Sequence, residues 1–269
     1  MYGAGIDLGS TQSKGIILDE DQRILGRALT STGVNLIKTA EKTLALALED
    51  AGLDSSEISY VVGTGYGRYR VKFGHTQISE ISCHAKGAKF IFPFTNTVLD
   101  IGGQDTKSIK VGHEGDVLDF NMNDKCAAGT GRFLDMAAYS LGLKLDDIGM
   151  MSLRSQMPVR FSSTCTVFVE TEIFQHLSTG KKPEDLLKGI YKAISNRCKA
   201  LMSRVGIEEE ITFTGGVSKN IGVVRTLEET FETKINVSEE SHYMGALGAA
   251  LFALERLSLP TSLEEERIG

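Results

Sequence analysis

The sequence of 269 residues has few cysteines, no long apolar run and no excess of positive charge. Its four cysteines lie too far apart for a Cys-x-x-Cys pair, which excludes a zinc knuckle and a local ferredoxin-type motif. No apolar stretch approaches the ~18 residues that a membrane-spanning helix needs. The net charge of −6 argues against a nucleic-acid-binding surface. The chain opens without the basic-then-apolar pattern of a signal peptide, so we expect a cytoplasmic protein with reduced thiols.

Two common nucleotide-binding motifs are also missing. The sequence contains no GxxxxGK[ST], and residues 180–182 do not supply one, so a P-loop is excluded. Residues 63–68 are rich in glycine but lack the GxGxxG spacing and the helix expected after it, which argues against a Rossmann site. The composition, 41% hydrophobic and 24% charged, indicates a globular protein with a substantial core.

A strand–Asp–glycine turn–strand unit occurs twice, at residues 4–18 and 97–111. The first copy turns after Asp7 and the second after Asp100. This weak internal repeat predicts two related α/β halves. The remaining periodicity predicts strands near 23–29, 59–62, 115–121, 211–213 and 234–237, and helices at 34–53, 79–90, 132–143, 165–178, 183–205 and 242–257.

Both turns have the chemistry of a phosphate-binding loop. Glycine lets the backbone approach phosphate oxygens closely, and a carboxylate at a strand end suits Mg²⁺. One such turn alone is equally well an ordinary β-hairpin. Two of them, with a third glycine turn at Gly215-Gly216, favour a nucleotide whose phosphates the first two turns hold from both sides.

The set of turns resembles the five-part site of the actin, heat-shock ATPase and sugar kinase superfamily. Its two phosphate loops, two connecting segments and adenosine loop match residues 7–14, 100–107, 126–131, 244–249 and 214–217 respectively. The resemblance implies an α/β fold of two related domains around a nucleotide cleft. We expect the first domain at residues 1–94 plus 244–269 and the second at 95–243.

The same resemblance implies roles for individual residues. Asp7 and Asp100 would hold Mg²⁺ and its waters, and Lys14 would touch the phosphates. Gln104 would orient the attacking water, since an amide is no strong base. The other ATP-binding residues that it implies are glycines and polar residues of the turns, namely Gly9, Ser10, Thr11, Gln12, Gly102, Gly103, Gly129, Gly215 and Gly216.

Two cysteines stand in unusual surroundings. Cys126 precedes a glycine turn into an expected helix, and Cys165 follows a run of serine and threonine at an apparent helix start. Helix N-termini attract anions, so both thiolates could bind an anionic cluster, although inert small residues remain the alternative. A [4Fe–4S] cluster needs four thiolates, so two per chain would require a symmetric dimer. Cys198 fits an apolar helix stripe, and Cys83 lies in a small-residue run; close packing explains both.

Residues 123–135 and 162–168 resemble the activator component of 2-hydroxyacyl-CoA dehydratases, a family related to the ATPase subunits of benzoyl-CoA reductase. The similarity spans roughly residues 3–257. It implies a homodimer with one [4Fe–4S] cluster bound by Cys126 and Cys165 of each chain. ATP hydrolysis would drive one low-potential electron to a separate dehydratase component, with reduced ferredoxin or flavodoxin as the electron source.

Two other functions fit the same fold. A small-molecule kinase would need a carboxylate base near the γ-phosphate; none is evident, and Cys126 and Cys165 would have no role. A regulatory ATPase without redox chemistry predicts ATP hydrolysis and no bound iron.

Overall fold

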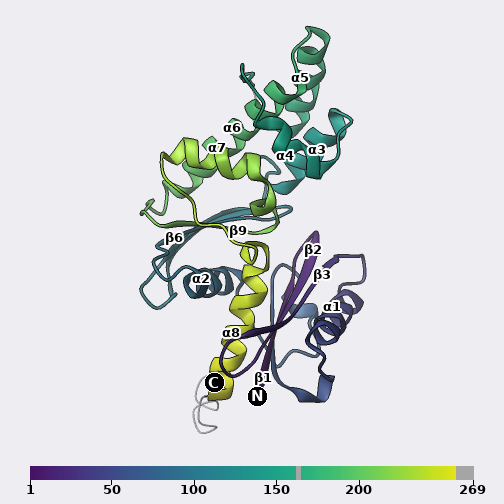
Figure 1. Cartoon of the computed structure of the whole chain (residues 1–269), viewed down its shortest axis with the longest axis vertical. Coiled ribbons are helices and arrows are strands. Elements are labelled where there is room, and N and C mark those ends of the chain that lie inside the picture. The colour runs from purple at the N-terminus through teal and green to yellow at the C-terminus, as the bar shows by residue number, and fades with distance from the viewer. Residues whose placement is uncertain (162–164, 259–269) are drawn as a thin grey trace. The chain divides into compact units, whose positions relative to one another are not determined.

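The computed structural model describes residues 1–161 and 165–258. The chain forms two compact units: the first consists of Met1–Ile91 and Tyr243–Gly269, and the second of Phe92–His242. Each unit is built on its own β-sheet (Figure 1). Within the described ranges, no helix is both long and apolar enough to cross a membrane.

The first unit has a five-stranded sheet in the order β3-β2-β1-β4-β5. Its helices α1 and α8 cover opposite faces of the sheet, as Figure 1 shows. Glycines allow both approaches: a side chain at Gly15 would press on Thr43 and Ala47 of α1, and one at Gly5 would collide with the α8 backbone. The elements are β1 (Tyr2–Leu8), β2 (Gln12–Leu18), β3 (Ile24–Ser31), α1 (Leu36–Ala51), β4 (Ile58–Thr64), β5 (Thr76–Gln77), α2 (Glu80–Ile91) and α8 (Met244–Ser258).

The second unit has a four-stranded sheet in the order β8-β7-β6-β9. Its core joins the sheet to the helices through fully buried side chains such as Ile101, Phe133 and Tyr191. The elements are β6 (Thr97–Ile101), β7 (Thr106–Val111), β8 (Val117–Asn123), α3 (Gly131–Ser140), α4 (Leu145–Ser152), α5 (Thr166–Ser178), α6 (Pro183–Met202), β9 (Ile211–Thr214) and α7 (Ile221–Phe231).

The two sheets repeat one plan. β1 pairs with β2 antiparallel and with β4 parallel, and β6 pairs in the same way with β7 and β9. The strand–turn–strand units predicted from the sequence are therefore the β1–β2 and β6–β7 hairpins, each at the centre of its sheet.

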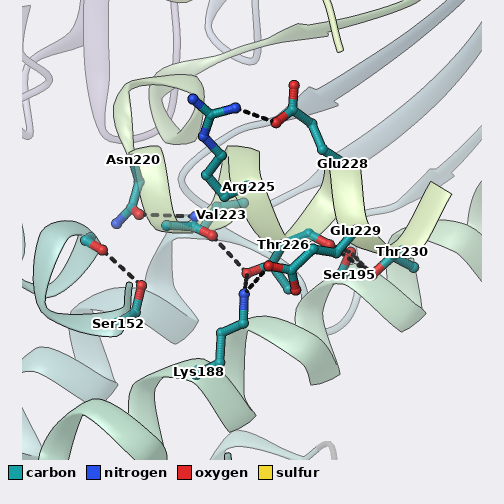
Figure 2. Close-up of polar contacts among 12 residues, drawn as sticks. Ser152, Lys188, Ser195, Asn220, Val223, Arg225, Thr226, Glu228, Glu229 and Thr230 are labelled. Carbon is teal, nitrogen blue, oxygen red and sulfur yellow. Dashed lines mark hydrogen bonds and ion pairs between the residues drawn. The ribbon is translucent and has the colours of Figure 1, made fainter. Parts of the chain in front are cut away.

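Helices α6 and α7 are joined by polar contacts (Figure 2). The Lys188 ammonium of α6 donates to Thr226 Oγ1 at 3.1 Å and to Glu229 Oε1 at 2.7 Å. One face of α6 is thereby fixed against α7, because a buried ammonium must keep its partners. Two turns later, Ser195 Oγ lies 2.8 Å from Thr230 Oγ1.

Three details differ from the sequence prediction. The helix expected at 132–143 ends at Ser140, where Gly142 takes a positive φ of 65° and the chain turns into α4. The strand expected at 234–237 is a single bridge between Thr212 and Asn236. The two-residue strand β5 and the helix α4 have no clear sequence pattern and were not predicted.

Candidate functional site

In the first unit, the central hairpin pairs an acid with a base. Asp7 lies directly opposite Lys14 in the β1–β2 ladder, and its Oδ2 is 3.8 Å from Lys14 Nζ. Both side chains are buried. Burying an ion pair costs free energy unless other groups also contact the two charges. The pair is therefore a poor source of stability, and this end of the sheet is suited to binding a charged ligand.

Glycines make room around the Asp7 carboxylate. Gly65, just after β4, has a φ of 88°, and a Cβ there would collide with Asp7 Oδ1. At the start of α8, a Cβ on Gly245 would lie 3.0 Å from Asp7 Oδ2 and 2.9 Å from His84 Nε2. Both positions therefore require glycine, which explains the small-residue segment at 244–249.

The first turn is held by Thr32, which follows β3. Its Oγ1 donates to Gly9 O at 2.9 Å, and its amide donates to Thr11 O at 2.9 Å. A side chain at Gly9 would lie 2.6 Å from Gln12 O, so only glycine fits this turn. Ser10 is half-buried, and Thr11 and Gln12 are exposed, which leaves their polar groups accessible to a ligand.

The second unit repeats the acid–base pair at closer range. Asp100 lies directly opposite Lys107 in the β6–β7 ladder. Lys107 Nζ is 3.1 Å from Asp100 Oδ2 and 2.8 Å from Asp105 Oδ2, and Thr214 Oγ1 donates to Asp100 Oδ1 at 3.2 Å. Asp100 and Lys107 are each 2% exposed, so this cluster is a buried polar network.

Gly215 lies against the carboxylate of Asp100 in the second unit in the same way that Gly65 lies against the carboxylate of Asp7 in the first. It also has a φ of 88°, and a Cβ there would collide with Asp100 Oδ1 and Ile101 O. Gly216 then begins a short 3₁₀ helix, η3 (Gly216–Lys219), which leads into α7. The structure thus places the predicted adenosine loop directly beside the predicted Mg²⁺ ligand of the second unit.

The second turn is bonded to the start of α3. The amide of Gly131 donates to Gly102 O at 2.9 Å, and the amide of Arg132 donates to Gly103 O at 3.0 Å. Gln104 is exposed in this turn, where it can reach a ligand. The first amides of α3, which have no partner within the helix, are thereby used to fix the turn.

The loop between β8 and α3 carries Cys126 and is closely braced. Asn123 Nδ2 donates to Cys126 O at 2.8 Å and to Ala128 O at 3.2 Å. Thr106 Oγ1, on β7, donates to Gly129 O at 2.6 Å, and Gly129 has a φ of 90°. Thr106, which directly follows the second turn, therefore joins that turn to this loop through a short hydrogen bond.

The two candidate metal-binding thiols differ in position. Cys165 is exposed and is the N-cap of α5, as predicted. Cys126 is half-buried and lies in the loop before Thr130, the N-cap of α3, so it precedes a glycine turn into a helix, as predicted. The glycine turn at residues 128–131 separates it from the helix. The capping serines and threonine expected at 162–164 lie outside the described residues.

Cys83 and Cys198 are buried and belong to hydrophobic clusters, which confirms the packing interpretation. Burial raises the pKa of each thiol to about 12. Both therefore stay protonated near neutral pH and are poor metal ligands. Within the part of the chain that the structure describes, no three His, Cys, Asp or Glu side chains are grouped as a metal site. Two cysteines from one chain are fewer than the three ligands of such a group, so this finding does not bear on Cys126 and Cys165.

Several residues of the site were not singled out from the sequence: Lys107, Asp105, Thr214, Gly65 and Thr32. Two signals could have found some of them. Lys107 follows Asp100 at the same spacing as Lys14 follows Asp7, and the dipeptide Thr-Gly occurs at both 64–65 and 214–215. Thr32 has no signal of this kind, because its role depends on the pairing of β3 with β2.

Residues 4–253 match the model of the BadF/BadG/BcrA/BcrD ATPase family. The chain belongs to this family. A curated relative of this ATPase, the 2-hydroxyisocaproyl-CoA dehydratase activator of Clostridioides difficile, is 43% identical over 255 residues, which cover 95% of this chain and 96% of the relative.

Two solved structures agree closely with this ATPase. Component A of the (R)-2-hydroxyglutaryl-CoA dehydratase of Acidaminococcus fermentans has a TM-score of 0.93 at 42% identity and covers 96% of this chain and 100% of its own. The activator of the 2-hydroxyisocaproyl-CoA dehydratase from Clostridium difficile, with bound ADPNP, has a TM-score of 0.91 at 41% identity and covers 100% and 98%.

The predicted fold class is confirmed by these structures and by a more distant one. A ROK family glucokinase from Streptomyces griseus has a TM-score of 0.62 at 13% identity and covers 95% of this chain and 100% of its own. That likeness concerns the fold alone. The kinase alternative therefore gains no support, since the relatives of more than 40% identity named above are dehydratase activators.

Proposed function

We propose that this ATPase activates a 2-hydroxyacyl-CoA dehydratase by using ATP hydrolysis to deliver a low-potential electron to it. The observation that carries this proposal is the direct bonding of the second phosphate-type turn to the cysteine-bearing segment through Gly131 and Arg132. The relatives named above, of more than 40% identity, are activators of dehydratases that act on 2-hydroxyacyl-CoA compounds.

The two hairpins supply the groups that Mg-ATP requires. Asp7 and Asp100 present carboxylates suited to Mg²⁺ and its waters, while Lys14 and Lys107 offset their charge. The amides and hydroxyls of the turns donate to phosphate oxygens, and the glycines keep the backbone close to them. Gln104, exposed in the second turn, orients the attacking water. The bound ADPNP in the Clostridium difficile structure supports nucleotide use by this family.

The chemistry of the thiols fits a [4Fe–4S] cluster shared by two chains. Cys126 and Cys165 are the two thiols outside the core, whereas Cys83 and Cys198 are buried and protonated. Two ligands from each member of a homodimer give the four that the cluster requires. When bound, such a cluster would hold the electron that a reduced ferredoxin or flavodoxin supplies.

The surface around Cys165 supports dimer formation. Val167, Phe168 and Phe174 on α5 are 67%, 63% and 53% exposed. Large apolar side chains grouped on one helix indicate a contact surface. A second copy of the chain would cover this helix and bring two more cysteines to the same place.

Hydrolysis can act on the cysteine loop through the second turn. Loss of the γ-phosphate removes contacts from residues 102–104, and the turn relaxes. Because Gly102 and Gly103 share hydrogen bonds with the first residues of α3, the helix start and the Cys126 loop move with it. The change in position alters the exposure and hydrogen bonding of the thiolates, the protein's means of setting a redox potential.

Iron analysis tests the proposal. Protein purified without oxygen should contain about four irons per two chains and show a broad visible absorption that dithionite bleaches. Cys126→Ser and Cys165→Ser should lose the iron, while the matched control Cys198→Ser should retain it. Iron-free protein that still hydrolyses ATP under strict anaerobiosis would instead support the regulatory ATPase.

A further inference from the structure

A cavity of about 180 Å³ lies in the second unit between α6, the end of β8 and the loop that carries Cys126. Its walls include Thr106 and Gly129 but not Asp100, Lys107 or the glycines at 102 and 103, so it adjoins the phosphate-type site without containing the charged groups of that site. It also lies on the part of α6 beyond Lys188 and Ser195, which contact α7 (Figure 2).

Two arginines dominate the charge of this cavity. Arg197 and Arg204 are seven residues apart on α6 and just beyond its end, so they project from one side of the helix. Neither forms an ion pair with a described residue, and no acidic side chain lines the cavity within the described ranges. The Arg197 stem packs on the loop, since its Cγ would be 3.7 Å from a Cβ on Gly129.

The other walls are partly apolar and partly polar. Met122, Ala128, Ala200 and Leu201 give an apolar surface, and Asn123 and Thr106 bring polar atoms. Arg197, Ala200 and Arg204 are exposed, so the cavity opens to solvent and a ligand can enter it. Its volume is below the roughly 300–1,000 Å³ of sites for drug-sized ligands, which favours a ligand smaller than a nucleotide.

We propose that this cavity binds a small organic carboxylate, which the two guanidinium groups recognise, and that its occupancy restrains the Cys126 loop. A guanidinium bonds a carboxylate through two parallel N–H···O contacts, and the apolar wall accepts a short carbon chain. The apolar wall beside the two arginines favours a carboxylate with a short carbon chain over inorganic phosphate. This site does not depend on the proposed cluster.

The restraint follows from the groups that the ligand would cover. Asn123 holds Cys126 O and Ala128 O, and Thr106 holds Gly129 O. Of these five residues, all except Cys126 line the cavity. A ligand packed against them limits the opening of the loop, because the loop cannot move without displacing it.

Isobutyrate is a suitable probe, and isobutyramide is its neutral isostere. Calorimetric titration of the anaerobically purified full chain should show saturable binding of isobutyrate and at least tenfold weaker binding of isobutyramide. Arg197→Ala/Arg204→Ala should weaken isobutyrate binding at least tenfold. The control Lys192→Ala/Lys199→Ala removes the same charge from α6 outside the cavity and should change it less than twofold. Ala200→Phe, which fills the cavity, should also abolish binding.

Hydrogen exchange measures the restraint. Saturating isobutyrate should slow amide exchange at residues 124–131 at least threefold in the wild-type protein and leave it unchanged in the double-arginine variant. If the arginine and lysine variants bind isobutyrate equally well, or if the wild-type protein binds isobutyrate and isobutyramide equally well, the proposed carboxylate site is wrong. If isobutyrate leaves the exchange rates of residues 124–131 unchanged, the proposed restraint of the loop is wrong. If a blocked glutamate peptide binds more tightly than isobutyrate, the carboxylate that the cavity recognises belongs to a protein side chain. That result would overturn the proposal of a free organic acid as the ligand.

Discussion

Lys107 lies opposite Asp100 across the β6–β7 hairpin, and its ammonium bridges the carboxylates of Asp100 and Asp105. Asp7 and Lys14 occupy the same places in the β1–β2 hairpin. The ammonium offsets the repulsion between the two carboxylates of Asp100 and Asp105.

Lys107→Met should therefore impair catalysis. It leaves two carboxylates without their cation, and we expect kcat for ATP hydrolysis to fall on the order of 100-fold, the usual cost of removing one fixed electrostatic group. Lys110→Met is the control, because Lys110 pairs with the half-exposed Glu208 away from the turn. Steady-state ATPase assays of both variants make the comparison, and equal kcat values would remove Lys107 from the mechanism.

Gly215→Ala should destabilise the second unit by more than the cost of placing an alanine at a positive φ. A left-handed conformation costs an alanine roughly 1–2 kcal/mol, and here the new Cβ also meets Asp100. Gly206→Ala is the matched control, since Gly206 has a φ of 82° and open space around it. We expect a lower Tm and weaker ATP binding for Gly215→Ala than for Gly206→Ala. Identical behaviour would contradict the close approach.

Gln104→Ala should separate binding from hydrolysis. The side chain is exposed in the turn and is assigned to the attacking water. We expect kcat to fall roughly 10–100-fold, as for loss of a water-orienting group, while the Kd for a non-hydrolysable ATP analogue changes less than about threefold. Unchanged turnover would show that another group orients the water.

The four thiols should fall into two classes. In the metal-free native protein at pH 8, iodoacetamide should modify Cys126 and Cys165 and leave Cys83 and Cys198 unmodified. Burial raises the pKa of the latter two to about 12, so they hold their protons, and the thiolate is the reactive form. Denatured protein, in which all four react, provides the control for mass spectrometry. Rapid labelling of Cys198 in the native state would contradict its burial.

Asp185 should make stability depend on acid pH. Its carboxylate accepts from the Met157 amide, Ser155 Oγ and the Gln156 amide at 3.0, 2.7 and 3.1 Å. These hydrogen bonds, the Met157 amide first, hold the pKa of Asp185 below its usual value. The stabilisation is thus present above the unfolded-state pKa of ~3.9 and is lost as the pH falls through the native pKa.

Asp185→Asn should lower the free energy of unfolding by about 1.5–3 kcal/mol at pH 7, the range for hydrogen bonds to a charged group. The difference from wild type should shrink as the pH falls below about 4. Asp147→Asn, at an exposed position of α4, should be close to neutral. Urea titrations at pH 7 and pH 3 measure these values, and a pH-independent difference would contradict the assignment.

The sequence predicted the hairpins and the glycine turns because their signals are local. An acid at a strand end followed by glycine can be read within ten residues, as at Asp7 and Gly9. The bracing of the turns was not predicted, since it depends on long-range pairing: Thr32 reaches the first turn only because β3 pairs with β2. The place of Cys126 before the glycine turn was predicted because that signal is local, whereas the hydrogen bonds from Asn123 and Thr106 that brace its loop were not.

The different anchors of the two turns mean that the two turns are not interchangeable. Thr32 ties the first turn to the end of a neighbouring strand, whereas the first amides of α3 tie the second turn to the cysteine segment. A chimera carrying two copies of the first turn would keep its phosphate-binding groups and lose its link to the thiols. The two turns thus share their phosphate-type chemistry, whereas the connection to the cysteine segment is a property of the second turn.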